Sequence, residues 1–147
     1  MSTSSDSPDT PTDVDFTVEE HTADWAIRVR GRDMRHLLLS AAWGMNSLLV
    51  TDLNAVPLSV ERTVTAEAFD RESLLVEWLG ELAYLTEMEG LVFRKFEFET
   101  VTTETLRATV RGGHAPELHK HIKAVTYHDL QIKETEAGLE ATVVFDV

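Results

Sequence analysis

Histidines are the residues best suited to metal binding or acid–base chemistry in this chain of 147 residues, which contains six of them. His114, His119 and His121 fall within one short segment, and two imidazoles separated by a single residue can chelate a transition metal. No cysteine accompanies them, and no H-E-x-x-H pattern is present. We therefore interpret this segment as a solvated polar loop rather than a metal centre.

Two other sets of polar residues could carry catalysis. Glu77 and Glu81 are four positions apart, so they share one face of a helix, where paired carboxylates could exchange protons. A solvated helix face explains the pair better, and we favour it. Ser47, His128 and Asp129 could form a nucleophilic triad, but no G-x-S-x-G motif supports it. With no Walker loop and no G-x-G-x-x-G, spacing alone indicates no enzyme.

Carboxylates also stand at the two ends of the predicted domain. Asp24 lies at the bend between the first two predicted strands, and Asp146 is followed only by Val147. Two carboxylates brought within about 4 Å repel by ~1 kcal/mol in water and ~4 kcal/mol at an effective dielectric of 20. A hard divalent cation with oxygen ligands would relieve that repulsion. Spacing along the chain does not by itself bring these ends together.

Composition and charge restrict the class of protein. Apolar residues make up 43% and charged residues 27%, as in an ordinary globular domain. The 26 acidic residues outnumber the 13 Lys and Arg, so a net charge of -13 repels RNA and anionic membranes. The N-terminus lacks the basic and apolar regions of a signal peptide, and no apolar run is long enough for a membrane helix. We expect a cytoplasmic protein.

The N-terminal part of the sequence predicts a tail followed by a single domain. Residues 1–14 are Ser, Thr, Pro and Asp with almost nothing apolar, which predicts a disordered acidic tail and a domain over 15–147. Period-two alternation predicts strands over 16–18, 26–30 and 60–66. Two helices are predicted by their caps and apolar stripes: one begins after Asp33 and ends at Leu49, and one runs from Asp70 to Gly90.

The rest of the sequence predicts strands. Alternation after Gly90 predicts strands over 91–99, 106–111, 122–132 and 141–147, with a loop at Gly-Gly-His-Ala-Pro, residues 112–116. Within 122–132, Lys123, Val125 and Tyr127 are expected to share one face. The first helix is apolar nearly all round, so it must be covered on more than one side. We predict an α+β fold, a layered β/α/β sandwich of mostly antiparallel sheets packed on two helices.

Four strings in the chain resemble the signatures of the archease family. They are HTADWAIRVRG (21–31), LLVEWLGELAYL (74–85), KAVTYHDLQI (123–132) and VVFDV (143–147), and they occur in family order. Together they span nearly the whole chain after the acidic tail. The resemblance implies a small cytoplasmic protein factor with a β/α/β fold, which agrees with the layering predicted above.

The resemblance also implies a function and a site. Archeases assist the RtcB-type RNA-splicing ligase of tRNA splicing and RNA repair, promoting its guanylylation by GTP and its multiple turnover without themselves being enzymes. Family members bind a divalent cation, calcium or in its place magnesium or manganese, through positions that correspond to Asp24 and Asp146, with Val147 supplying a terminal oxygen. Lys123 matches a position important for ligase activation. We expect His21 to contribute to activation as well, by a local orienting hydrogen bond rather than by direct ligation of the cation.

Two alternatives remain open from the sequence. One is a chaperone-like module for RNA-modifying enzymes. The other is a small metal-dependent hydrolase that uses Asp24 and Asp146 around a cation, although the sequence contains no evident general base or substrate-binding loop. The acidic balance favours a protein partner, with no direct nucleic-acid binding and no membrane attachment.

Overall fold

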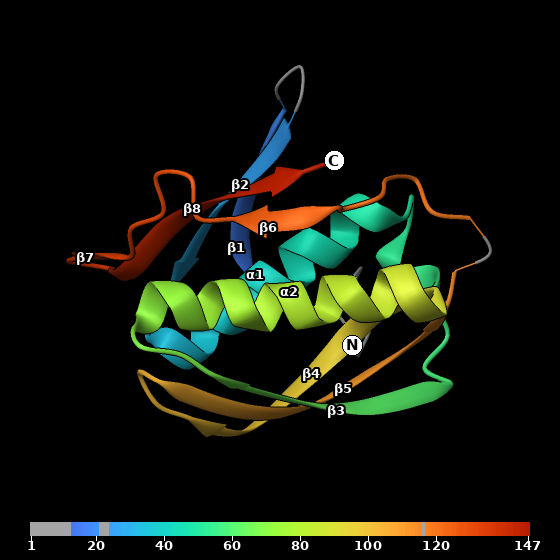
Figure 1. Cartoon of the computed structure of the whole chain (residues 1–147), viewed down its shortest axis with the longest axis horizontal. Helices are drawn as coiled ribbons and strands as arrows, with labels where there is room; N and C mark the ends of the chain where they lie inside the picture. The colour runs from blue at the N-terminus through green and yellow to red at the C-terminus, as the bar shows by residue number, and fades with distance from the viewer. Residues whose placement is uncertain (1–12, 21–23, 116) are drawn as a thin grey trace, which may run out of the picture.

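Two antiparallel sheets enclose a layer of two helices, as Figure 1 shows. The computed structural model describes residues 13–20, 24–115 and 117–147, without the side chains of residues 20 and 24. The larger sheet has the order β1-β2-β8-β6, with β7 also paired to β8, and the smaller has the order β3-β5-β4. The larger sheet consists of β1 (Asp15–Glu20), β2 (Asp24–Gly31), β6 (Ala124–Thr126), β7 (Lys133–Thr135) and β8 (Gly138–Asp146). The smaller sheet consists of β3 (Val60–Glu67), β4 (Leu91–Val101) and β5 (Thr105–His114).

Both helices begin and end where the sequence predicts. In α1 (Met34–Leu49), the Asp33 carboxylate accepts a hydrogen bond from the His36 amide at 2.9 Å. In α2 (Arg71–Glu89), Asp70 accepts from the Ser73 amide at 2.8 Å, and Gly90 ends the helix in the left-handed conformation. A short 3-10 helix, η1 (Leu53–Ala55), follows α1. No helix in the described ranges is long and apolar enough to cross a membrane.

The central helix α1 confirms the predicted sandwich. Nearly all of its residues are buried, because it packs against β2 on one side and β4 on the other. Gly44, in the middle of the helix, lets the Phe16 ring of β1 approach closely. A Cβ atom at Gly44 would lie 3.0 Å from the Phe16 Cγ. Gly44 therefore lowers the helix propensity of α1 but allows the Phe16 ring to pack closely against it.

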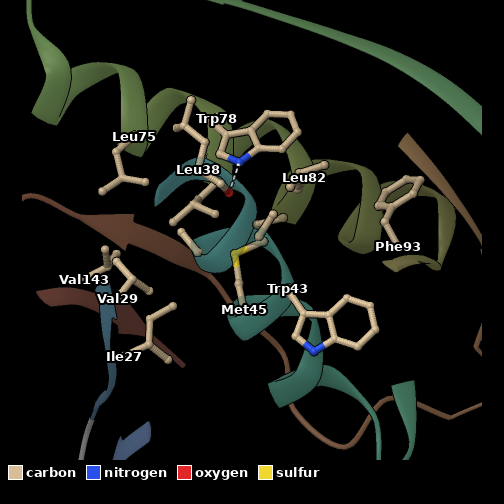
Figure 2. Packing of buried hydrophobic residues seen from close by; sticks show 14 of the residues in the cluster. Ile27, Val29, Leu38, Trp43, Met45, Leu75, Trp78, Leu82, Phe93 and Val143 are labelled. Carbon is tan, nitrogen blue, oxygen red and sulfur yellow. Dashed lines mark hydrogen bonds between the residues drawn. The ribbon is translucent and has the colours of Figure 1, made fainter. Parts of the chain in front are cut away.

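One continuous core fills the space between the sheets, and Figure 2 shows its centre. Trp78 of α2 is fully buried, and its indole Nε1–H donates to the carbonyl oxygen of Leu38 in α1 at 3.0 Å. The Phe96 and Phe98 rings of β4 pack against the same indole at centroid distances of 6.1 and 5.1 Å. This contact joins both helices to the smaller sheet.

The predicted strand over 122–132 is wrong in its extent. Within the predicted range only β6 (Ala124–Thr126) pairs with β8. Residues 127–132 leave the sheet, and β7 returns to pair with β8 after residue 132. A turn forms there because the Leu130 amide bonds to the Tyr127 carbonyl and Asp129 takes a positive φ of 51°. The Ile132 amide then donates to the Glu72 carboxylate of α2 at 2.9 Å. A tertiary bond thus replaces strand pairing in this segment.

The predicted loop over 112–116 is also corrected. Strand β5 continues through Gly112 and Gly113 to His114, paired with β4. A Cβ atom at Gly112 would lie 1.9 Å from the Val92 carbonyl oxygen, so only glycine fits there. The two glycines therefore allow close strand packing and do not mark a turn.

The domain described by the structure includes two residues of the predicted tail. The Asp13 carboxylate lies 3.0 Å from the Arg32 guanidinium, and the Asp13 carbonyl oxygen is 2.8 Å from His36 Nε2. Val14 packs against the core. Residues 13 and 14 of the predicted tail thus contact the domain, while residues 1–12 lie outside the described part of the chain.

Candidate functional site

The register of the larger sheet brings Asp24 opposite Asp146. Strand β2 begins at Asp24, and the antiparallel β8 ends at Asp146, so the first residue of one strand pairs with the last of the other. Ala124, the first residue of β6, pairs with Asp146 on its other side. The three strands therefore place both predicted acidic positions at one end of the sheet, where the chain also terminates (Figure 1). The side chain of Asp24 lies outside the described part, so this pairing is one of backbone positions.

Alternation along β8 turns Asp146 away from the core. Phe145 is fully buried toward the helices, and successive strand residues point to opposite faces, so Asp146 lies on the outer face, where it is exposed. Val147 follows directly, is half-buried and packs against the core. The Asp146 side chain is thus held on the outer face at the end of β8, and Val147 follows it directly.

Lys123 is attached to this end through its backbone. Its amide N–H donates to the Asp146 carbonyl oxygen at 2.7 Å. Lys123 precedes β6 and is exposed, and Tyr127 follows β6 and is also exposed, so the strand face predicted to contain both does not exist. Val125, paired with Phe145, is the only one of the three expected face-sharing residues that lies within β6.

A cation–π contact beside the site was not predicted from the sequence. The Lys120 ammonium lies 4.2 Å from the ring centroid of Trp25, the residue that follows Asp24. This contact depends on the path of residues 115–123, where the His119 amide donates to the Leu49 carbonyl at 2.6 Å. No local pattern encodes that path, so no sequence signal could have found the contact. It brings a second lysine, in addition to Lys123, to the end of β2 and β8 that carries Asp24 and Asp146. We call this end the acidic strand end.

The donor set fits a hard cation by type. Asp24, Asp146 and the Val147 carboxylate offer only oxygen atoms, which Ca²⁺ and Mg²⁺ prefer. Among the side chains that the structure describes, no three His, Asp or Glu residues converge to hold a metal. A cation bound at this end of the sheet would therefore need Asp24 in addition to Asp146 and Val147.

The other candidate groups do not assemble. His121 lies 3.2 Å from the Glu87 carboxylate, and it forms no metal cluster with His114 and His119. The Ser47 hydroxyl donates to the Gly44 carbonyl at 2.6 Å, within its own helix. His128 and Asp129 form an exposed pair at 3.3 Å in the 127–132 turn, with no bond to Ser47. His21 lies outside the described residues, so its orienting role stays a prediction.

Comparison with known proteins decides the family. Residues 16–147 match the model of the Archease protein family (MTH1598/TM1083). The chain belongs to the archease family. It is 38% identical to the protein archease of Methanosarcina mazei over 136 residues, covering 87% of this chain and 92% of that one. It is 35% identical to the protein archease of Methanopyrus kandleri, covering 87% and 96%.

Solved structures agree with this membership in the archease family. The solution structure of Methanobacterium thermoautotrophicum protein 1598 matches with a TM-score of 0.76 and 30% identity, covering 90% of this chain and 98% of that one. The crystal structure of a Thermotoga maritima archease, described as a possible chaperone, matches with a TM-score of 0.58 and 24% identity, covering 88% and 94%. The second likeness concerns the fold alone.

Proposed function

We propose that this protein activates an RtcB-type RNA-splicing ligase of tRNA splicing and RNA repair in the cytoplasm. In this role it is not an enzyme: it promotes GTP-dependent guanylylation of the ligase and allows multiple turnover. The observation that carries the proposal is the meeting of Asp24, Asp146 and Lys123 at one strand end. The observation concerns the backbones of these residues, and their positions are the ones that the family resemblance connects with cation binding and ligase activation.

In this proposal the acidic strand end binds one divalent cation. Asp24, Asp146 and the terminal carboxylate of Val147 would hold Ca²⁺, or Mg²⁺ or Mn²⁺ in its place. The cation would supply positive charge that offsets the repulsion between the carboxylates. The protein's own contribution is to fix two of these donors on the end of a strand that is paired on both sides.

Lys123 is the proposed contact to the partner. Its side chain is exposed, while its backbone is held by Asp146. A lysine carries a compact charge on a flexible stem, which suits a partner's carboxylate or a nucleotide phosphate. The net charge of -13 disfavours direct RNA binding, which supports a protein as the partner.

A guanylylation assay tests the proposal. The purified ligase from the same organism is incubated with labelled GTP, with and without this protein, and covalent label and ligated RNA are measured over several turnovers. Faster labelling and more than one turnover per ligase are expected. No change in either rate would contradict the proposal.

Two further readouts separate the alternatives. A chaperone-like module would protect heated ligase from aggregation without changing the labelling rate of the folded enzyme. A metal-dependent hydrolase would release product from a phosphate ester in the absence of ligase. Activation of folded ligase, with neither of these effects, is the result that the proposed function requires.

A further inference from the structure

The outward side of α2 exposes two large apolar side chains one helical turn apart. Tyr84 is 59% exposed and Met88 is 65% exposed, although most of α2 is buried on its other sides. In Figure 1, α2 lies between β6 and β3 and in front of α1, and no described element covers its outer side. Neighbouring exposed apolar residues on one rigid element are a feature of protein-binding surfaces.

The same side of the helix carries uncompensated negative charge. Glu77 and Glu81 are exposed, and neither has an ion-pair or hydrogen-bond partner among the described residues. Like charges four residues apart destabilise a helix. Elsewhere on α2 the glutamates are paired: Glu87 with His121 at 3.2 Å, and Glu89 with Arg62 at 2.6 Å. No described contact within the molecule therefore offsets the repulsion between Glu77 and Glu81.

Gly80 is an independent feature of this surface. It lies in the interior of α2, one turn before Tyr84, where glycine is a poor helix former. A Cβ atom added at Gly80 would meet nothing within 4 Å, so the fold does not require glycine there. This differs from Gly44, where the Phe16 ring fills the space. A missing side chain that serves no internal contact permits close approach by an outside molecule.

We propose that this face of α2, formed by Glu77, Gly80, Glu81, Tyr84 and Met88, docks a protein surface with basic side chains around an apolar recess. Tyr84 and Met88 are the apolar anchors, the two glutamates meet the partner's cations, and Gly80 allows close approach. The identity of that partner rests on the proposed function: it is the RNA ligase.

Charge disfavours other occupants of this face. A second copy of the chain would bring four glutamates into one interface, and RNA would oppose phosphates to them. A basic protein surface is the complement that remains.

The position of the face also connects it with the acidic strand end. The segment that carries Lys123 runs along α2, because His121 pairs with Glu87 and the Ile132 amide bonds to Glu72. The same segment is tied to the carbonyl oxygen of Asp146 through the Lys123 amide. A partner seated on α2 therefore lies beside the segment that presents Lys123.

Gly80→Ala gives the sharpest test, because stability and binding should change in opposite directions. Alanine favours the helix and meets no clash, so the melting temperature should rise by about 2–4 °C. Affinity for the purified ligase, measured by calorimetry, should fall at least threefold, roughly, because a methyl group intrudes on the contact. Weaker binding by a more stable protein cannot result from misfolding.

Two further variants extend the test, each with a matched control. Tyr84→Ala should weaken ligase binding about tenfold or more, whereas Phe69→Ala, at a 95% exposed residue outside the face, should not. Glu81→Lys should weaken binding, whereas Glu97→Lys on the outer face of the smaller sheet should not. All variants should keep the wild-type circular dichroism spectrum.

The outcomes distinguish this surface from the proposed function. If the wild-type protein activates the ligase but Gly80→Ala and Tyr84→Ala bind it undiminished, only the proposed docking surface on α2 is overturned. Absence of wild-type binding and activation would overturn both. A wild-type dimer in sedimentation that Tyr84→Ala dissociates would overturn the ligase as occupant in favour of a second copy.

Discussion

The backbone amide of Lys123 donates to the carbonyl oxygen of Asp146 at 2.7 Å. This bond joins the segment before β6 to the last residue of β8, and it leaves both side chains exposed. The carboxylate proposed to bind a cation and the lysine proposed to contact the partner are therefore fixed relative to each other without direct side-chain contact. The two side chains can be tested separately, because neither supplies the connecting bond.

Asp146→Asn should weaken Ca²⁺ binding and ligase activation while leaving the fold intact. The amide keeps the shape of the side chain but removes its charge, and an exposed substitution usually changes the free energy of unfolding by less than about 0.5 kcal/mol. Calorimetric titration with Ca²⁺ and the guanylylation assay measure the two losses. Glu97→Gln is the matched control, and unchanged Ca²⁺ affinity in Asp146→Asn would remove the metal prediction.

Lys123→Ala should stimulate the ligase poorly but fold and bind Ca²⁺ normally. Alanine retains the backbone N–H that bonds to Asp146, so only the exposed ammonium is lost. Lys133→Ala, at an exposed lysine of β7, should retain full stimulation. Full activity in Lys123→Ala would make the residue a solvated lysine without function, and lost activity with a lower melting temperature would make its role structural.

Trp78→Phe should destabilise the protein by about 1–3 kcal/mol. The substitution removes the Nε1–H bond to the Leu38 carbonyl and leaves space beside Phe98 in the core. Urea unfolding followed by circular dichroism measures the change. Phe69→Leu, at an almost fully exposed residue, should change stability by less than about 0.5 kcal/mol. Equal effects of the two substitutions would show that the buried bond contributes little.

Local chemistry explains which elements the sequence could predict. Asp33 and Asp70 cap their helices through amides only three residues away, so the cap is visible in the sequence itself. The break between β6 and β7 depends instead on Glu72, which accepts from Ile132 across 60 positions. Alternation alone cannot reveal such a bond, and the predicted strand over 122–132 was therefore too long.

Part of the candidate site could likewise be predicted from the sequence, and part could not. Asp24 and Asp146 were paired through the family resemblance, because nothing in their spacing predicts that β2 and β8 are neighbours. The register confirms that their backbones are opposite each other. The contact of Lys120 with Trp25 could not be predicted, since it requires the tertiary path of a segment without regular secondary structure.

The acid response of the N-terminal segment provides a last prediction. The Asp13 carboxylate accepts a hydrogen bond from Arg32, which lowers the pKa of Asp13 below its ordinary value of 3.8. The folded state therefore releases this proton more readily than the unfolded state. The stabilisation is present above the ordinary pKa and is lost as the pH falls through the lowered one.

Asp13→Asn should lower the free energy of unfolding at pH 7 by up to about 1 kcal/mol, because the Arg32 pair is largely exposed. The difference from the wild-type protein should begin to shrink as the pH falls below 3.8 and should vanish below the lowered pKa of folded Asp13, where the wild-type carboxylate is neutral as well. Urea unfolding of both proteins at neutral and acid pH measures it, with Asp129→Asn as an exposed control. No difference between the two proteins at pH 7 would show that Asp13 acts through its backbone carbonyl contact with His36, which the substitution retains, and not through its charge.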